Sequence, residues 1–180
     1  MAFYTKEYLR NRLDGTSSEE IQQLINSFRA KNSYDVFLSH SYSDKEFIQS
    51  LILELESINL DVYVDWIVDP ELKRSSITKH SIQIIRERLR QSKCLIYATS
   101  VASSRSRWMP WELGYMDGLV GKCAILPILE RKNAIYQGKD LLQVYPYITL
   151  DETRDQVDMK RIRIHESTHD YTRIDSWLNK

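Results

Sequence analysis

Residues 34–51 read YDVFLSHSYSDKEFIQSL, a strand-like run followed by a helix-like one. The first part, YDVFLSH, is short, apolar and rich in residues that favour β-structure, which is typical of a buried strand. In the polar part that follows, Ser43 and Asp44 can cap a helix over DKEFIQSLILELESI. The stretch therefore predicts a strand, a polar loop and a helix in that order.

The same alternation continues along the chain. DVYVDW (61–66), KCLIYATS (93–100) and KCAILPIL (122–129) predict three further strands, and ITKHSIQIIRERLRQS and residues 106–118 predict helices between them. Strands that are apolar on both faces and alternate with amphipathic helices indicate a parallel sheet covered on both sides. We therefore predict an open, doubly wound α/β sheet of the flavodoxin-like kind, with ligands bound at the carboxyl ends of its strands.

Both ends of the chain add further elements. SSEEIQQLINSFRA predicts a capped amphipathic helix, and with KEYLRNRL it predicts a helical N-terminal extension over residues 1–32, ahead of a main domain over residues 33–180. YPYITL and KRIRIH alternate around the polar turn DETRDQVD, which predicts a hairpin at the sheet edge. The final segment, YTRIDSWLNK, predicts a short helix.

The bulk composition excludes several classes of protein. The 25 Lys and Arg residues balance the 25 Asp and Glu residues, so no net charge attracts the chain to nucleic acid or to an anionic membrane. No apolar run approaches the roughly 20 residues that span a bilayer, and the N-terminus lacks the apolar stretch of a signal peptide. We expect a soluble cytoplasmic protein in which Cys94 and Cys123 are buried, reduced thiols.

Several common sites lack support in the sequence. The chain has neither G-x-G-x-x-G nor the P-loop pattern, and it has no G-x-S-x-G nucleophile elbow. HESTH (165–169) matches the zinc pattern H-E-x-x-H, but Ile162 and Ile164 before it alternate like a strand, so the required helix is not predicted. We therefore predict no metal site.

Polar residues gather where the first strand of the core ends. Ser39, His40, Ser41, Asp44 and Lys45 follow this strand at the predicted carboxyl edge of the sheet. A purely structural role remains open for two of them, because Asp44 can cap the next helix and His40 can bond a backbone carbonyl.

Residues 106–118, SRWMPWELGYMDG, place two tryptophans, a proline and a glutamate at a helix start. Pro110 suits the first turn and favours an extended Met109, so we expect Trp108 just before the helix and Glu112 inside its first turn. There the positive end of the helix dipole favours an ionised carboxylate. An ordinary stabilising arrangement beside two core tryptophans remains the alternative.

YDVFLSHSYSDKEFIQSL, LDVYVDW and SKCLIYATSVASSRSRWMPWELGYM together resemble the core of a bacterial Toll/interleukin-1 receptor (TIR) domain, over about residues 33–130. The resemblance implies the TIR fold. It also implies NAD+ cleavage at the nicotinamide–ribose bond, with NAD+ as substrate and no resident cofactor. In the family the catalytic glutamate ends a W-x-x-x-E motif, which matches Trp108 and Glu112.

The resemblance implies further site residues. Trp108 is the first candidate to stack on the nicotinamide ring and Trp66 the second, and Ser39, His40, Ser41 and Lys45 would line the cleft, with Lys45 near a phosphate. Residues 65–76, which begin at Asp65, correspond to the BB loop, through which TIR domains self-associate and help to complete the site. Here Trp66 follows Asp65 directly and the loop lacks glycine, unlike the usual family pattern.

The single-domain layout resembles the stand-alone TIR proteins of Thoeris-type antiphage systems. That layout implies synthesis of a cyclic ADP-ribose isomer that activates a separate effector protein. The alternative is a TIR interaction module that assembles through its BB loop and performs no chemistry. A third reading, an enzyme like the nucleoside deoxyribosyltransferases, shares the α/β layout but finds no support in DVFLSH.

Overall fold

The computed structural model describes residues 2–28, 30–72, 75–132, 134–136, 138, 140–151 and 162–179. Its strands are β1 (Tyr4–Thr5), β2 (Tyr34–Ser39), β3 (Val62–Tyr63), β4 (Ser92–Thr99), β5 (Cys123–Leu129), β6 (Tyr147–Leu150), β7 (Ile162–His165) and β8 (Tyr171–Arg173). Its α-helices are α1 (Lys6–Asp14), α2 (Ser18–Ser27), α3 (Lys45–Ser57), α4 (Asp65–Val68), α5 (Lys79–Arg90), α6 (Trp108–Val120) and α7 (Ile174–Leu178). Short 3₁₀ helices are η1 (Tyr42–Asp44), η2 (Ala102–Arg105) and η3 (Asp140–Val144).

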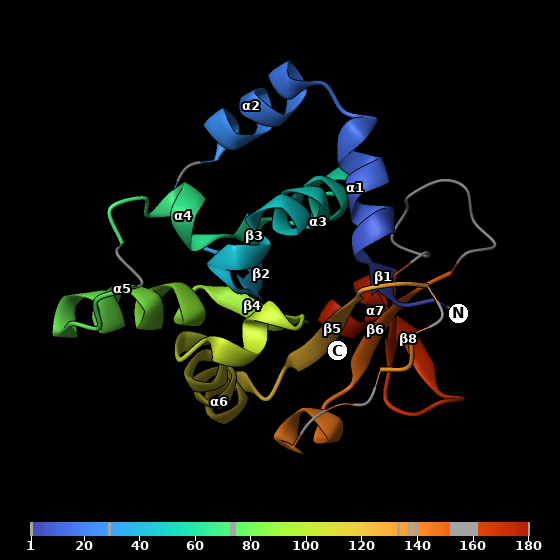
Figure 1. Cartoon of the computed structure of the whole chain (residues 1–180). Helices are drawn as coiled ribbons and strands as arrows, with labels where there is room; N and C mark the ends of the chain where they lie inside the picture. The colour runs from blue at the N-terminus through green and yellow to red at the C-terminus, as the bar shows by residue number, and fades with distance from the viewer. Residues whose placement is uncertain are drawn as a thin grey trace.

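One sheet organises the molecule, with strand order β3-β2-β4-β5-β6-β7-β8 (Figure 1). The strands from β3 to β6 pair in parallel, whereas β6–β7 and β7–β8 pair antiparallel. The order of the five parallel strands is that of a flavodoxin-like sheet, whose switch point lies between β2 and β4. This confirms the predicted fold class and places the carboxyl ends of β2 and β4 where a ligand site is expected.

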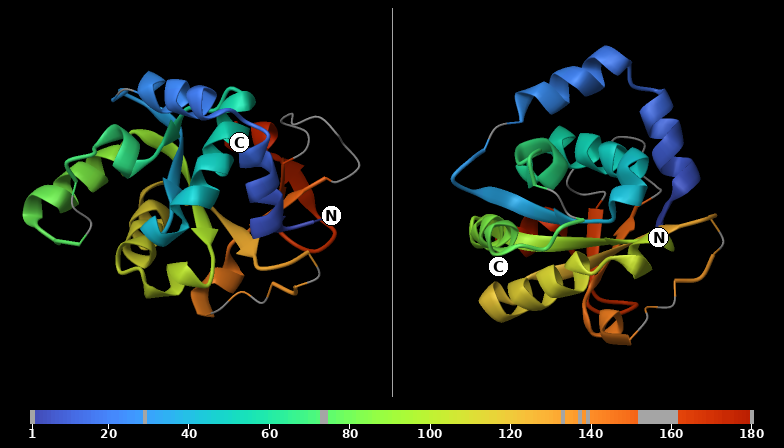
Figure 2. Two further views of the ribbon diagram at one scale, coloured as in Figure 1. Left: turned by 45° about the horizontal axis from the view of Figure 1, so that its top comes forward. Right: turned by 60° about the vertical axis from the view of Figure 1, so that its left-hand side comes forward.

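Helices cover both faces of the sheet (Figure 2). Along β2, Val36 and Leu38 belong to the apolar cluster that includes α1 and α3, whereas Phe37 belongs to the cluster that includes α5 and α6. Successive side chains of a strand point to opposite faces, so a strand covered on both sides must be apolar throughout. The continuous apolar runs in the sequence therefore correctly predicted a sheet that is covered on both faces.

The N-terminal helices are confirmed, and an additional strand joins them to the sheet. α2 begins with the predicted capping box, in which Ser17 and Glu20 exchange side-chain and backbone hydrogen bonds. β1 pairs in parallel with the end of β5, with Tyr4 opposite Ile128. No sequence pattern indicated this strand, because two residues show no periodicity. The division between an extension and a main domain at residues 32 and 33 stays a prediction.

Two boundaries differ from the sequence prediction. The second strand was expected to run to Trp66, but β3 contains only Val62 and Tyr63, and Asp65 and Trp66 begin α4. β3 lies at the sheet edge and pairs with β2 over two residues, so the chain is free to turn afterwards. Asp65 then carries its negative charge in the first turn of a helix, which is a favourable position.

The second difference concerns the start of α6. The helix begins at Trp108, and Met109 is helical, not extended. Pro110 is tolerated as the third residue because the first four N–H groups of a helix have no intrahelical partner. Glu112 consequently lies one full turn inside the helix.

The C-terminal hairpin is confirmed by the antiparallel pairing of Tyr147 with His165, and the short helix is α7. The turn of this hairpin, residues 152–158, lies outside the described residues. β8 was not predicted. HESTH spans a strand end and a bend, not a helix, as expected. Within the described ranges, no helix is both long and apolar enough to cross a bilayer.

Candidate active site

Ser39 and Glu112 meet at the carboxyl edge of the sheet. Ser39 is the last residue of β2, and Glu112 lies on α6, which follows β4 after η2. The Ser39 hydroxyl donates a hydrogen bond of 2.6 Å to Oε2 of Glu112. Two residues that are 73 positions apart in the chain are thereby joined at the switch point of the sheet.

The Glu112 carboxylate is enclosed by the protein. The exposed fraction of Glu112 is 0%, and that of Ser39 is 1%. Burying a carboxylate costs free energy unless hydrogen bonds replace the lost water, so the Ser39 hydroxyl is a necessary partner. Burial and the negative charge of Glu112 together raise the pKa of the neighbouring Tyr97 phenol.

Trp108 and Trp111 occupy different environments. Trp108 is 7% exposed and belongs to the core beneath α5 and α6, whereas Trp111 is half-buried and packs against this core from outside. Their rings meet edge to face, with centroids 5.9 Å apart. Trp108 is therefore the more deeply packed of the two tryptophans. Trp108 nevertheless precedes Glu112 by one helical turn, on the same side of α6.

His40 is held by two hydrogen bonds. Its Nδ1 lies 2.8 Å from the Leu38 carbonyl, and its Nε2 lies 2.9 Å from the indole Nε1 of Trp66. A carbonyl only accepts and an indole only donates, so these contacts assign a neutral imidazole with its proton on Nδ1. The carboxylate of Asp65 approaches the same Nε2 at 3.5 Å. His40 thus makes the bond to a backbone carbonyl that the sequence left open as its structural role. Its contact with Trp66 also positions α4.

Lys45 and Trp66 pack against each other. The ammonium of Lys45 lies 4.6 Å from the centroid of the Trp66 ring and 5.7 Å from that of Tyr42. A cation over an aromatic face contributes about 0.5–2 kcal/mol. Lys45 therefore has an aromatic partner here, and its expected contact with a phosphate stays a prediction. The same holds for stacking of Trp66 on a ligand.

A cavity of about 600 Å³ opens beside these residues. Ligand sites for small molecules commonly have volumes of about 300–1,000 Å³. Of the predicted site residues, His40, Ser41, Asp65 and Trp108 line the cavity. Ser39 and Glu112, both buried, are not among the lining residues, and Lys45 and Trp66 lie beside it. The remaining lining residues are Lys6, Tyr42, Ser43, Ser75, Val101, Ala102, Arg105, Ser106, Arg107 and Glu130.

Sequence reasoning missed the cations of this cavity. Arg105 and Arg107 come from the end of η2 and the residue before α6, and Lys6 comes from the start of α1. The R-S-R spacing of Arg105 and Arg107 beside a strand end was a usable signal. Lys6 gave none, because only the pairing of β1 with β5 brings it to this edge.

A buried network ties the two loops of the site together. Asp44, expected to cap the next helix, occupies the N-cap position of α3 but makes no side-chain capping bond. Its Oδ2 instead accepts a hydrogen bond of 2.6 Å from the Ser100 hydroxyl, which in turn accepts from the backbone N–H of Ser103. The loop after β2 is thereby fixed to the loop after β4, a role that the sequence did not reveal.

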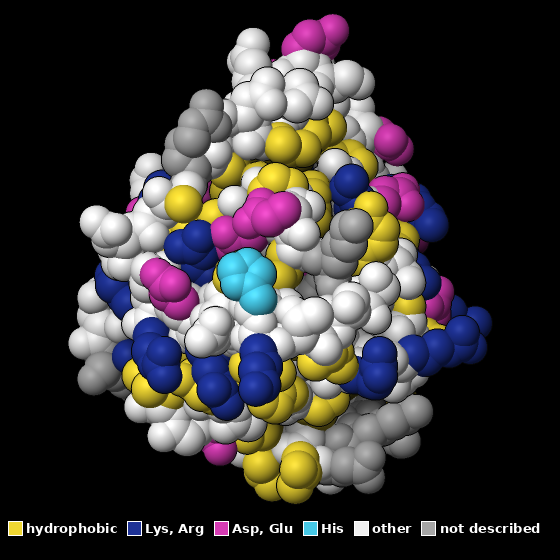
Figure 3. All heavy atoms as spheres, turned by 90° about the vertical axis from the view of Figure 1, so that its left-hand side faces the viewer, with side chains coloured by type: hydrophobic (Ala, Val, Ile, Leu, Met, Phe, Trp, Pro, Cys, Tyr) yellow, Lys and Arg dark blue, Asp and Glu magenta, His cyan; other side chains and the backbone are white. Residues whose placement is uncertain are grey.

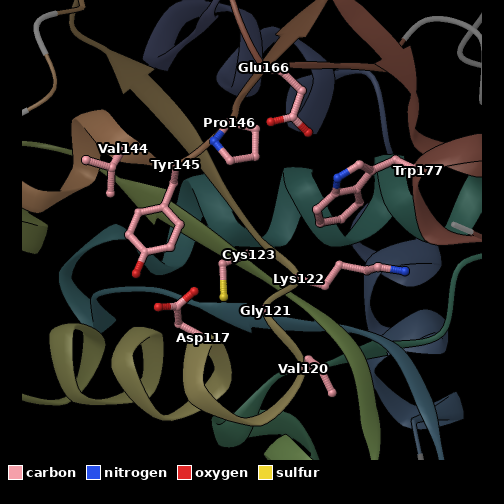
Figure 4. A pocket seen from close by; sticks show the side chains of 10 residues that line it. All are labelled: Asp117, Val120, Gly121, Lys122, Cys123, Val144, Tyr145, Pro146, Glu166 and Trp177. Atoms are coloured by element: carbon pink, nitrogen blue, oxygen red, sulfur yellow. The ribbon is translucent and has the colours of Figure 1, made fainter.

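A second cavity of about 390 Å³ lies at the opposite, amino-terminal edge of β5 (Figure 4). Tyr145 points toward the carboxylate of Asp117, and Trp177 forms the far wall (Figure 4). Burial raises the pKa of the Cys123 thiol to about 12, so this thiol is protonated at neutral pH. Because it lies at the amino-terminal edge of the sheet, this cavity is separate from the Ser39–Glu112 contact at the carboxyl edge. Among the described residues, no group of three His, Cys, Asp or Glu side chains is placed to hold a metal ion.

Comparison with known proteins places this geometry in a family. A family model described as "TIR domain" matches residues 36–163. A relative from Bacillus cereus (strain MSX-D12), named "Probable 3′ cyclic ADP-D-ribose synthase ThsB′", is 39% identical over 165 residues, which cover 89% of this chain and 83% of the relative.

Two further matches are shorter or more distant. "Putative cyclic ADP-D-ribose synthase TIR2" from Cytobacillus dafuensis is 33% identical over 91 residues, which cover 50% of this chain and 24% of that protein. The crystal structure of the TIR domain of the Toll-related receptor TRR-2 from Hydra magnipapillata matches with a TM-score of 0.41 and 19% identity, over 58% of this chain and 76% of that one. By the family model and the Bacillus cereus relative, the chain belongs to the TIR domain family.

Proposed function

We propose that this TIR protein cleaves the nicotinamide–ribose bond of NAD+ and joins the ADP-ribose into a cyclic isomer, as an immune signal in Thoeris-type antiphage defence. The observation that carries the proposal is the buried Glu112 carboxylate, bonded to Ser39 and one helical turn from the cavity-lining Trp108. Both relatives are named as synthases of a cyclic ADP-ribose, which favours an enzyme over a pure assembly module.

The chemistry of the bond suits a lone carboxylate. When the C–N bond breaks, nicotinamide leaves with the bonding electron pair as a neutral base, so it needs little acid assistance. Positive charge develops on the ribose ring, and a carboxylate near the anomeric carbon stabilises this oxocarbenium-like transition state. Glu112 would supply that charge, and the Ser39 hydroxyl would hold the carboxylate in place.

The second step decides between hydrolysis and cyclisation. A nucleophile must form a new bond to the anomeric carbon, and it is either water or a group of the same ADP-ribose. An enclosed site excludes water and leaves the internal nucleophile closer to the reacting carbon. The burial of Glu112 and Trp108 therefore supports a cyclic product, whose formation would activate a separate effector protein.

Access to Glu112 is part of the proposal. Because Glu112 is fully buried and does not line the cavity, the substrate reaches it only after neighbouring side chains move. Residues 65–76, the BB loop of the family, supply Asp65 and Ser75 to the cavity wall. We infer that self-association through this loop displaces it and completes the site, so that activity depends on assembly.

The test is incubation of the purified full chain with NAD+, followed by chromatography and mass spectrometry of the products. Crowding agent and infected-cell lysate are included to drive assembly. We expect the wild type to release nicotinamide and a cyclic ADP-ribose, and Glu112→Gln to be at least about 10³-fold slower, since it lacks the transition-state charge. Glu87→Gln, an exposed glutamate of α5, is the matched control. Intact NAD+ with the wild type under all conditions, or equal turnover by Glu112→Gln, would overturn the assignment.

A further inference from the structure

Two arginines line the cavity beside Trp108. Arg105 and Arg107 both line it, and both are exposed. Within the part of the chain that the structure describes, no carboxylate lies within ion-pairing distance of either guanidinium. The guanidinium groups are therefore available to a ligand.

The other charged groups around the cavity face partners other than the two arginines. The ammonium of Lys6 lies 2.7 Å from the carboxylate of Glu130, and this ion pair closes the rim between α1 and the end of β5. Asp65 faces the His40 ring at 3.5 Å. Because His40 is neutral, it does not cancel the charge of Asp65, but neither arginine forms an ion pair with Asp65. The two guanidinium groups are thus available to the two negative charges of a pyrophosphate diester. Arginine is also the side chain whose planar fork best matches phosphate oxygens.

The position of the two arginines agrees with one extended ligand. Arg107 directly precedes Trp108, and Glu112 follows one helical turn later, so all three side chains are set by the same end of α6. Along the chain, Trp108 lies between the arginines at the cavity rim and the buried carboxylate of Glu112. A dinucleotide offers one group to each of them: a pyrophosphate to the arginines, a nicotinamide ring to Trp108 and the ribose carbon of the scissile bond to Glu112.

We propose that Arg105 and Arg107 form the pyrophosphate subsite of this cavity and select substrates that carry a pyrophosphate. The inference rests on the proposed function, because it assumes that a dinucleotide binds here. Nicotinamide riboside has the same scissile bond but no phosphate. It would therefore gain nothing from the two arginines, which act on substrate binding and not on bond cleavage.

The test measures binding separately from turnover. The full chain with Glu112→Gln is titrated by calorimetry with ADP-ribose, with inorganic pyrophosphate and with adenosine. We expect Arg105→Gln and Arg107→Gln each to weaken ADP-ribose and pyrophosphate binding about tenfold, as for the loss of a charged hydrogen bond. Binding of adenosine stays unchanged. Arg86→Gln is the control, since this exposed arginine of α5 lies over Trp111 and Tyr115 and not at the cavity.

Several outcomes would overturn the subsite. These are unchanged ADP-ribose affinity in the double variant, an equal loss for adenosine, or no ADP-ribose binding by the parent. Kinetics then separate the two proposals. A wild type that consumes NAD+ with a KM insensitive to Arg105→Gln and Arg107→Gln contradicts the subsite alone. A wild type that leaves NAD+ intact, while ADP-ribose binding still depends on both arginines, contradicts only the proposed function.

Discussion

The Ser39 hydroxyl and the Glu112 carboxylate are hydrogen-bonded at 2.6 Å, and both residues are shielded from water. The contact joins the end of β2 to the second turn of α6, so it contributes to the fold as well as to the candidate site. A buried acceptor that loses its donor retains the cost of desolvation. The same hydrogen bond therefore stabilises the fold and holds the carboxylate of the candidate site in place.

Ser39→Ala tests this contact. We expect the free energy of unfolding to fall by about 1.5–3 kcal/mol, the usual range for a hydrogen bond to a charged group. In the Glu112→Gln background the same substitution should cost only about 1 kcal/mol, because the acceptor is neutral. Urea denaturation of the four proteins gives the coupling, with Ser104→Ala as the exposed control. An equal cost in both backgrounds would contradict the argument.

Asp69 and Arg88 form a two-pronged ion pair that fixes the segment after α4 to α5. Nε and the second terminal nitrogen of Arg88 donate to the two carboxylate oxygens at 2.9 and 2.7 Å, and the Tyr63 hydroxyl donates to Asp69 at 2.9 Å. The hydrogen bond to Asp69 raises the pKa of Arg88, so the guanidinium stays charged at every accessible pH.

Asp69→Asn should therefore be costly. It leaves the half-buried Arg88 guanidinium without its carboxylate partner, for which we expect a loss of about 1.5–3 kcal/mol in the free energy of unfolding. Arg88→Met in addition removes the unpaired charge and should restore part of the stability. Urea unfolding of the single and double variants provides the measurement. A double variant that is no more stable than Asp69→Asn would show that the charge is not the cause.

The parallel core was predictable because its periodicity is long and uniform. β4 and β5 are apolar on both faces, and α3 and α5 are amphipathic, so these local patterns agreed with one architecture. The strand order that the structure shows is one of the two common to doubly wound sheets. Glu112 was named for a different reason, because it matches the last residue of the family's W-x-x-x-E motif, and its catalytic role stays a prediction. The spacing also keeps Trp108 and Glu112 on one side of a helix wherever the helix begins.

Elements only about one period long were not predictable. β1 has two residues and α4 has four, so neither offers a pattern against which a strand or helix can be recognised. The cavity walls depend on such elements: β1 brings Lys6 to the carboxyl edge, and α4 turns Trp66 onto His40. The residues of the site could thus be named in part from the sequence, whereas their contacts required the assembled fold.

Glu54 anchors the N-terminal segment from inside the core. Its two carboxylate oxygens accept hydrogen bonds of 2.9 Å from the hydroxyls of Tyr4 and Tyr8, and the carboxylate is fully buried. Removing both hydroxyls with Tyr4→Phe and Tyr8→Phe leaves this charge with poorer compensation. We expect each substitution to cost about 1.5–3 kcal/mol. The measurement is urea denaturation, with Tyr42→Phe, an exposed tyrosine, as control.

Repeating the tyrosine substitutions in a Glu54→Gln background distinguishes two explanations of that loss. If Glu54 is the reason, Glu54→Gln should lower the cost of removing the tyrosine hydroxyls, because a neutral amide is cheaper to leave buried. If packing of the rings is the reason, the cost should not depend on residue 54. Equal costs in both backgrounds would therefore contradict the anchoring role.

The His40–Trp66 hydrogen bond predicts a particular tautomer. With Nδ1 bonded to the Leu38 carbonyl and Nε2 accepting from the indole, His40 should be neutral and carry its proton on Nδ1. Long-range ¹H–¹⁵N correlation spectra identify the tautomer directly. Trp66→Phe, which removes the donor, should cost about 1–3 kcal/mol of unfolding free energy because Nε2 stays buried without it. A proton on Nε2 in the wild type would contradict this arrangement.

His165 predicts how stability depends on pH. Burial lowers the pKa of this imidazole, which stacks on Tyr147 with ring centroids 5.0 Å apart and bonds the Thr149 hydroxyl through Nε2 at 2.8 Å. Above the unfolded-state pKa of about 6.5, the ring is neutral in both states and its contribution is fully present. As the pH falls below that value, the unfolded state binds a proton that the folded state resists, so stability is lost.

His165→Gln isolates this effect. Glutamine cannot titrate, so the variant should lack the part of the pH dependence that begins near pH 6.5 and continues downward until the folded protein also binds the proton. Urea unfolding from pH 8 to pH 5 gives the free energy for both proteins. The difference between wild type and variant should shift in favour of the variant as the pH falls. A constant difference over this range would mean that His165 binds its proton equally well folded and unfolded. The dense band of Lys and Arg on the face of Figure 3 would not produce the same curve, since these side chains keep their charge over this pH range.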